Sequence, residues 1–68
     1  MGLAIAERLA HDGFRVVLAD RNAELAPRAA EGLRGQGLRA EHRVVDLADE
    51  DAARALVRAL PPLAALIN

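Results

Sequence analysis

The sequence predicts an α/β fold in which helices and strands alternate around a parallel sheet. Apolar residues switch between helical and strand spacing in the order helix, strand, helix, strand, helix, strand over the 68 residues. The connections are short, which favours parallel strands joined by helices. Two apolar runs, 14–19 and 42–45, each stop at an aspartate, Asp20 and Asp46. We expect residues 1–68 to form a single α/β unit.

The first half of the chain predicts a helix, a strand and a second helix. The first helix has an apolar stripe made of Leu3, Ile5, Ala6, Leu9 and Ala10. Gly13 is expected to end it, and residues 14–19 have the apolar run of a strand. Asn22 is the predicted N-cap of a helix over about 23–35, in which Pro27 falls near the first turn and costs little.

The second half repeats the pattern. Residues 35–37 (Gly-Gln-Gly) predict a turn, and 38–45 alternate as a strand. A third helix is expected over 49–60 and should end at the prolines 61–62. Residues 63–67 then predict a buried strand. The expected inner face of the third helix consists of Ala52, Ala53, Leu56, Val57 and Leu60.

Composition restricts the chemistry that this chain can perform. It contains no Ser, Thr, Tyr, Lys or Cys, so the usual nucleophiles and most proton-transfer groups are missing. A chain without Cys has no disulfide or thiolate metal site, which fits a reducing compartment. The nine cationic residues are spread against ten acids for a net charge of −1, which argues against nucleic-acid or membrane-surface partners. We expect a soluble, cytoplasmic protein without a metal site.

Two carboxylates are expected at the carboxyl edge of the sheet, where open α/β folds bind nucleotides. Asp20 could accept hydrogen bonds from both ribose hydroxyls of a nucleotide, or could be an ordinary solvated acid. Asp46 could contact the same ligand, could cap the third helix, or could do both. The acidic run 49–51 is more simply a solvated first helical turn that complements the helix dipole.

Four segments in register resemble the short-chain dehydrogenase/reductase family. The segment from Met1 to Ala10 resembles the opening of the family's first helix, and Gly2 would be the last glycine of its Thr-Gly-x-x-x-Gly-x-Gly loop. Residues 17–20 (Val-Leu-Ala-Asp) look like the second strand with its ribose-binding acid. Asp46-Leu47 looks like the pair that contacts the adenine ring, and 66–68 (Leu-Ile-Asn) like the start of the Asn-Asn-Ala-Gly segment.

The resemblance implies a partial Rossmann-type doubly wound sheet that lacks its central first strand and is truncated at both ends. It implies an oxidoreductase that transfers hydride between a nicotinamide and a carbonyl or alcohol substrate. The family's catalytic Ser and Tyr-x-x-x-Lys have no counterpart here, so we expect the chain alone to be inactive. The implied cofactor-binding residues are Gly2, Asp20, Arg21, Asp46, Leu47 and Asn68.

The pair Asp20-Arg21 bears on the choice of cofactor. Arg21 could pair with the 2′-phosphate of NADP, whereas Asp20 would repel it. Two negative groups about 4 Å apart at a partly dry site cost about 4 kcal/mol, and one exposed arginine returns about 1 kcal/mol at most. We therefore expect NAD rather than NADP, with weak or absent binding by these residues alone.

The missing strand affects the expected topology. In the doubly wound order 3-2-1-4, the first strand lies between the strands expected at 14–19 and 63–67. Strand 63–67 should therefore move in beside 14–19 or leave a gap one strand wide, and open edges at these strands would favour self-association.

Two alternative functions remain open at this stage. The chain could be an interaction or complementation module that docks through its open strand edges. It could also be a signalling receiver module with Asp46 as phosphoacceptor, although such a module needs a lysine and the chain has none.

Overall fold

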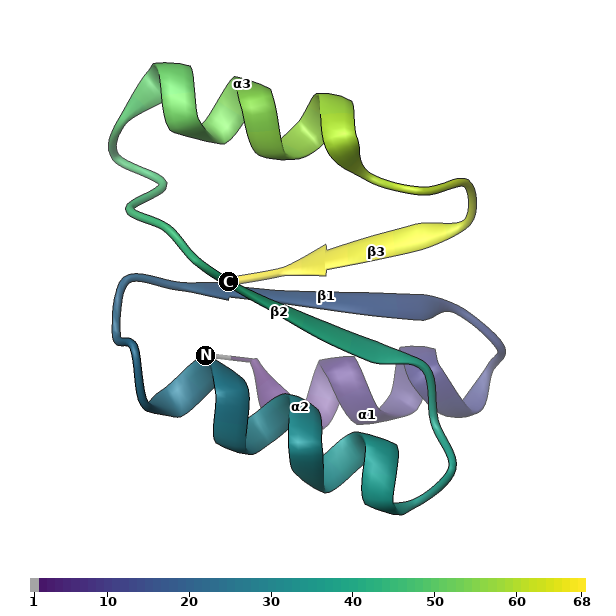
Figure 1. The fold of residues 1–68 in the computed structure, drawn as a ribbon. Helices are drawn as coiled ribbons and strands as arrows, with labels where there is room; N and C mark the ends of the chain where they lie inside the picture. Colours follow the sequence, from purple (N-terminus) through teal and green to yellow (C-terminus); the bar gives the residue numbers. More distant parts are fainter. Residues whose placement is uncertain (1) are drawn as a thin grey trace.

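The computed structural model describes residues 2–68 and confirms the predicted order of elements. The helices and strands are α1 (Leu3–His11), β1 (Arg15–Asp20), α2 (Leu25–Gly35), β2 (Ala40–Val44), α3 (Glu50–Ala59) and β3 (Ala64–Ile67). The three strands form one parallel sheet in the order β2-β1-β3. Figure 1 shows α1 and α2 on one face of this sheet and α3 on the other. The predicted α/β class with a partial doubly wound sheet is confirmed.

Strand β3 lies directly beside β1, as the first of the two predicted alternatives required. The register places Val16 opposite Ala65 on one side of β1 and opposite Ala40 on the other. β1 is therefore the central strand, and the free edges belong to β2 and β3. The expectation that β1 itself has an open edge is wrong, because β3 pairs with it along most of its length.

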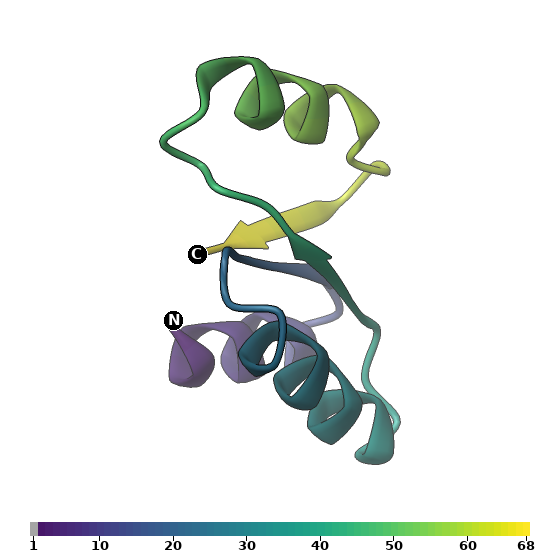
Figure 2. The same cartoon turned by 60° about the vertical axis from the view of Figure 1, so that its left-hand side comes forward.

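The position of α1 explains why β3 pairs with β1. α1 packs against both β1 and β3, as α2 packs against both β2 and β1. The N–H of Gly2, the residue before α1, donates to the carbonyl of Asn68, the residue after β3, at 3.3 Å. Figure 2 shows the start of the chain near the end of β3. β3 thus fills the place beside β1 that a strand preceding α1 would fill in a βαβ unit.

Two apolar clusters hold the sheet and the helices together. Val16 and Leu18 are fully buried against α1 and α2, whereas Val17 and Ala19 point to the α3 face. This division follows from the alternation of side chains along a strand. The helices contribute small residues to the first cluster, including Ala6 and Ala30 at 0% exposure. Small side chains let a helix lie close to the sheet and still leave few voids.

Helix α3 is the least supported helix of the fold. Leu56 is buried against Val17 and Ala19, and Leu60 packs at the edge of that cluster. Val57 was expected to face inward but is 57% exposed, so that prediction is wrong. The reason is that, among the helices of residues 2–68, only α3 lies on this face of the sheet, so no second helix covers the flank beside Leu56 (Figure 1).

Local hydrogen bonds define where the second and third helices begin. Asn22 Oδ1 accepts from the N–H of Glu24 at 2.8 Å and of Leu25 at 3.2 Å, so Asn22 closes the turn that leads into α2. The N-cap itself is Glu24, two residues after the predicted Asn22, and the Glu24 side chain makes no capping hydrogen bond. Asp49, not Asp46, is the N-cap of α3, because its Oδ1 accepts from the N–H of Asp51 and Ala52. The alternative role of Asp46 as the cap of this helix is therefore wrong.

Strand β3 is less buried than the sequence predicts. All of its residues, Ala64–Ile67, are only half-buried, because none of the elements in the described part of the chain covers its outer edge. Leu63 precedes it at 79% exposure and with φ of +60°, a left-handed conformation that is unfavourable for leucine. In residues 2–68 there is no helix long and apolar enough to cross a membrane.

Candidate functional site

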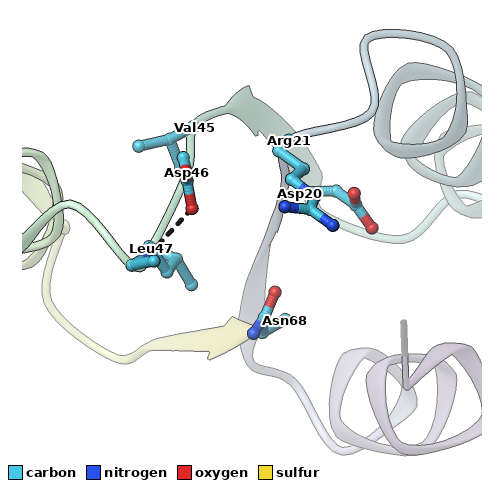
Figure 3. A pocket seen from close by; sticks show the side chains of 7 residues that line it. Asp20, Arg21, Val45, Asp46, Leu47 and Asn68 are labelled. Atoms are coloured by element: carbon cyan, nitrogen blue, oxygen red, sulfur yellow. Dashed lines mark hydrogen bonds between the residues drawn. The ribbon is translucent and has the colours of Figure 1, made fainter.

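Three polar residues meet at the carboxyl edge of the sheet, each from a different strand. Asp20 is the last residue of β1, Asp46 follows β2 by two residues, and Asn68 comes directly after β3. Because the strands are parallel, their carboxyl ends lie at the same edge. Figure 3 shows these side chains around a cavity of about 190 Å³. Its lining consists of Asp20, Arg21, Val45, Asp46, Leu47, Ala48 and Asn68.

Asp20 is held in a fixed orientation at the rim of this cavity. Its Oδ1 accepts a hydrogen bond from the N–H of Asn22 at 2.9 Å. Among residues 2–68, none donates a hydrogen bond to its second oxygen, Oδ2. The side chain is half-buried, so one face of the carboxylate is free to accept hydrogen bonds from a ligand's hydroxyl groups.

Asp46 and Leu47 form the opposite wall of the cavity, on the loop between β2 and α3. Asp46 Oδ1 accepts from the N–H of Ala48 at 3.0 Å, which is an Asx turn. This turn points Leu47 back toward the sheet, where it packs against the cluster on the α3 face. The wall therefore combines one exposed carboxylate with one half-buried apolar side chain.

Arg21 supplies the positive charge at the cavity. Its side chain is exposed, and none of the ion pairs within residues 2–68 involves it. Figure 3 shows Arg21 and Asp20 side by side at the end of β1. The cavity therefore carries two carboxylates and one guanidinium, with charges of both signs at the same strand end.

Gly2 lies apart from the cavity lining and reaches it only through its hydrogen bond to Asn68. Its φ of −82° is open to any residue. A Cβ placed there would meet Ile67 Cγ2 at 3.5 Å, an ordinary van der Waals contact. Nothing in the local backbone therefore requires glycine at this position.

The structure brings together five of the six residues expected to bind a cofactor, namely all except Gly2. Sequence reasoning missed Val45 and Ala48, which also line the cavity. Their positions on either side of Asp46-Leu47 could have identified them, because a loop that presents two residues to a ligand also presents its neighbours.

The lining offers polar and apolar groups that could hold a ligand. Residues 2–68 hold no cluster of side chains suited to a metal ion. The cavity offers carboxylates to hydroxyl groups, an amide to the edge of a base, and the apolar atoms of Val45 and Leu47 to a flat ring. Its lining includes no hydroxyl, thiol or amine side chain.

Comparison with known proteins identifies the family. The family model described as short chain dehydrogenase matches residues 1–68. The chain belongs to the short-chain dehydrogenase family. It is 40% identical over 72 residues to a gluconate 5-dehydrogenase of Gluconobacter oxydans (strain 621H), covering 100% of this chain and 28% of that dehydrogenase. No solved structure gave a significant match. The match therefore concerns the cofactor-binding N-terminal part of a short-chain dehydrogenase.

Proposed function

We propose that these residues bind the adenosine half of NAD, as the cofactor-binding part of a cytoplasmic short-chain dehydrogenase. The observation that supports this most directly is the position of Asp20, whose carboxylate is fixed at the rim of the cavity with one oxygen unused by residues 2–68. An acid at the end of the second strand of a dinucleotide fold accepts hydrogen bonds from the adenosine ribose.

Each remaining lining residue has a matching role in this proposal. Leu47 would contact one face of the adenine ring, and Asp46 and Asn68 would lie at its polar edges. The cavity of about 190 Å³ is smaller than the roughly 300–1,000 Å³ of a site for a drug-sized ligand. It therefore fits an adenosine better than a whole dinucleotide.

We propose NAD rather than NADP as the cofactor. A 2′-phosphate on the ribose would lie against Asp20, and two negative groups about 4 Å apart cost about 4 kcal/mol at an effective dielectric constant of 20. Arg21 is exposed, so its attraction to the same phosphate is screened and returns about 1 kcal/mol at most. The repulsion from Asp20 outweighs that attraction.

Affinity in the isolated chain should be low. Pyrophosphate groups bind to N–H groups at a helix N-terminus, and Gly2 at the start of α1 does not line the cavity. We expect a Kd for NAD of about 1 mM or weaker. Adenosine 5′-monophosphate should bind nearly as well as NAD, because the nicotinamide half gains no contacts.

The whole protein would transfer hydride between the nicotinamide of NAD and a carbonyl or alcohol group. This chain lacks the residue types that would protonate or deprotonate that group, namely Tyr and Lys. We therefore propose that it binds the cofactor without turning it over. Membership of the family favours this function over a receiver module with Asp46 as phosphoacceptor.

The test is an NMR titration of the labelled chain with adenosine 5′-monophosphate and with adenosine 2′,5′-bisphosphate. Amide shifts should change at residues 20–22 and 45–48 with the monophosphate, and the bisphosphate should bind at least fivefold more weakly. Asp20→Asn should abolish that preference because it removes the repelling charge. Glu24→Gln, an exposed acid outside the cavity, is the matched control and should leave the preference intact.

Amide shift changes that are spread over the chain and are absent from residues 20–22 and 45–48 would contradict the proposed site. A preference that Asp20→Asn leaves unchanged would contradict the proposed role of this carboxylate. Tight binding of NAD, well below 1 mM, would show that the phosphate contacts are less important than we argue.

A further inference from the structure

The two free edges of the sheet differ in how many of their backbone groups are already used. In a parallel pair, alternate residues of a strand point their backbone groups toward the neighbouring strand. Arg39 and Val45 point toward β1, because the carbonyl of Arg39 accepts from the N–H of Val16 and the N–H of Val45 donates to the carbonyl of Asp20. The residues of β2 that point away from β1 are therefore Ala40, His42 and Val44.

Arginine side chains cap the edge of β2. Arg34 Nη1, from α2, donates to the carbonyl of Ala40 at 2.9 Å, and Arg43 Nη1 donates to the carbonyl of His42 at 2.8 Å. Arg43 also pairs with Glu41 at 3.2 Å. Two of the three outward-facing carbonyls of β2 thus already accept hydrogen bonds from arginine side chains. Such charged side chains at a strand edge block pairing with another strand.

Within residues 2–68, no arginine side chain caps the edge of β3 in this way. The N–H of Arg15 donates to the carbonyl of Leu63, so the outward-facing residues are Ala64, Leu66 and Asn68. The N–H of Ala64 is taken by the carbonyl of Pro61, and the carbonyl of Asn68 by Gly2. Within residues 2–68, the backbone hydrogen bonds leave unused the carbonyl of Ala64, both groups of Leu66 and the N–H of Asn68.

We propose that the outer edge of β3 pairs antiparallel with β3 of a second copy of this chain, about a two-fold axis at Leu66. In that register the N–H and carbonyl of Leu66 bond to the carbonyl and N–H of the partner's Leu66. The N–H of Asn68 donates to the carbonyl of the partner's Ala64, and by symmetry the N–H of the partner's Asn68 donates to the carbonyl of Ala64. Each group that β3 leaves unused finds its complement, and no charged residue lies on the strand.

The position of α1 supports a second copy as the occupant. α1 packs against both β1 and β3, so it lies about half a strand spacing inside the edge. Pairing of the two β3 strands then places α1 and its symmetry mate about two strand spacings, or about 10 Å, apart on the same face of the sheet. Packed helices are separated by 8–10 Å, so the two α1 helices would touch.

Ile5 is the side chain that this contact would cover. It is 62% exposed, although it lies in an apolar stripe. Its Cδ1 and the Cγ2 of Ile67 both lie within 4 Å of the place of a Cβ on Gly2, so it sits beside the end of β3. The other flank of α1, with Leu3 and Glu7, faces α2 instead. A second α1 therefore gives Ile5 an apolar neighbour near the two-fold axis.

The first test measures the oligomeric state by sedimentation equilibrium from about 10 µM to 1 mM, a range suited to a small interface. The chain should form a dimer, and Ile5→Glu should weaken the dimer at least tenfold by placing like charges at the axis. Val57→Glu changes a side chain of similar exposure, 57%, on α3, and should leave dimerisation unchanged. Both positions are exposed, so both variants should fold.

The second test follows the backbone of β3 directly. Hydrogen exchange of the Leu66 amide should slow as the protein concentration rises, while exchange of the His42 amide should not change. Leu66→Pro removes an N–H that β1 does not use and should abolish the dimer, whereas Leu66→Ala keeps the N–H and should retain it. A monomer at 1 mM, a Leu66 amide unaffected by concentration, or equal loss of dimer with Val57→Glu would overturn the proposal.

Discussion

At the scale of single residues, Asn22 joins the candidate site to the fold. Its backbone N–H orients Asp20, and its side chain accepts from the N–H groups of Glu24 and Leu25 in the turn that leads into α2. One turn of four residues therefore fixes both the direction of the carboxylate and the start of the helix. A change at Asn22 should affect stability and nucleotide preference together.

We expect Asn22→Ala to destabilise the chain by about 1 kcal/mol, because the N–H groups of Glu24 and Leu25 at the start of α2 lose their acceptor. Asn22→Ser keeps a side-chain acceptor at this position and should cost less than half as much. The free energy of unfolding, measured by urea denaturation with circular dichroism, checks both values. Equal losses for the two variants would show that the cap contributes nothing beyond the side-chain volume.

Leu63 is a second residue with a local cost. It is 79% exposed, and its φ of +60° carries a penalty of about 1–2 kcal/mol for a residue with a Cβ. Leu63→Gly should stabilise the chain by about 0.5–1 kcal/mol after the greater flexibility of glycine is subtracted. Leu63→Ala keeps the Cβ and should give no gain. A destabilised Leu63→Gly variant would show that the Leu63 side chain packs against neighbouring residues in solution.

At the scale of elements, α3 depends on few contacts with the rest of the chain. Leu56 is buried at 8% exposure against the sheet, and Val57 beside it is open to solvent. The N-terminal end is well capped by Asp49, so the helix itself is defined locally. What attaches it to the sheet is a single cluster of apolar side chains.

Leu56→Ala should therefore cost about 2 kcal/mol, at the low end for a buried leucine, because α3 can shift to close the space. Val57→Ala, one residue further along, should change stability by about 0.5 kcal/mol or less. Urea denaturation of both variants measures this difference. Amide exchange in α3 should also be faster than in β1, and slower exchange in α3 would contradict the weak attachment.

At the scale of the whole molecule, the chain has a small core and an open sheet edge. A 68-residue unit buries only about 60% of the surface of its unfolded chain, and neither a disulfide nor a metal site compensates within residues 2–68. Its stability should therefore be low and should depend on association.

We expect a broad thermal transition whose midpoint rises with protein concentration, because association through β3 stabilises only the folded chain. Circular dichroism melts of the wild-type chain over a hundredfold range of concentration measure this shift. Ile5→Glu should reduce the concentration dependence without changing the midpoint of the most dilute sample. A sharp transition independent of concentration in the wild-type chain would contradict this expectation.

The order of helices and strands, and the residues near their ends, could be predicted from the amino-acid pattern alone. The spacing of apolar residues gives helices and strands within one or two residues of those observed. Asp20 ends β1 as predicted, and Asp46 follows the end of β2 by two residues. Such features depend on neighbours within a few residues, so the local pattern contains them. Five of the six expected site residues share one cavity for the same reason, since each follows or ends a parallel strand.

Which elements lie next to each other could not be predicted from the amino-acid pattern and follows from the packing of the whole chain. The pattern of residues 63–67 predicts a strand but does not choose between pairing with β1 and leaving a gap. Exposure of Val57 and the capping of the β2 edge by Arg34 likewise depend on residues distant in sequence. The spacing of apolar residues specifies which face of a helix or strand is apolar. Which other element packs against that face depends on how all the helices and strands together bury their apolar residues in a small core.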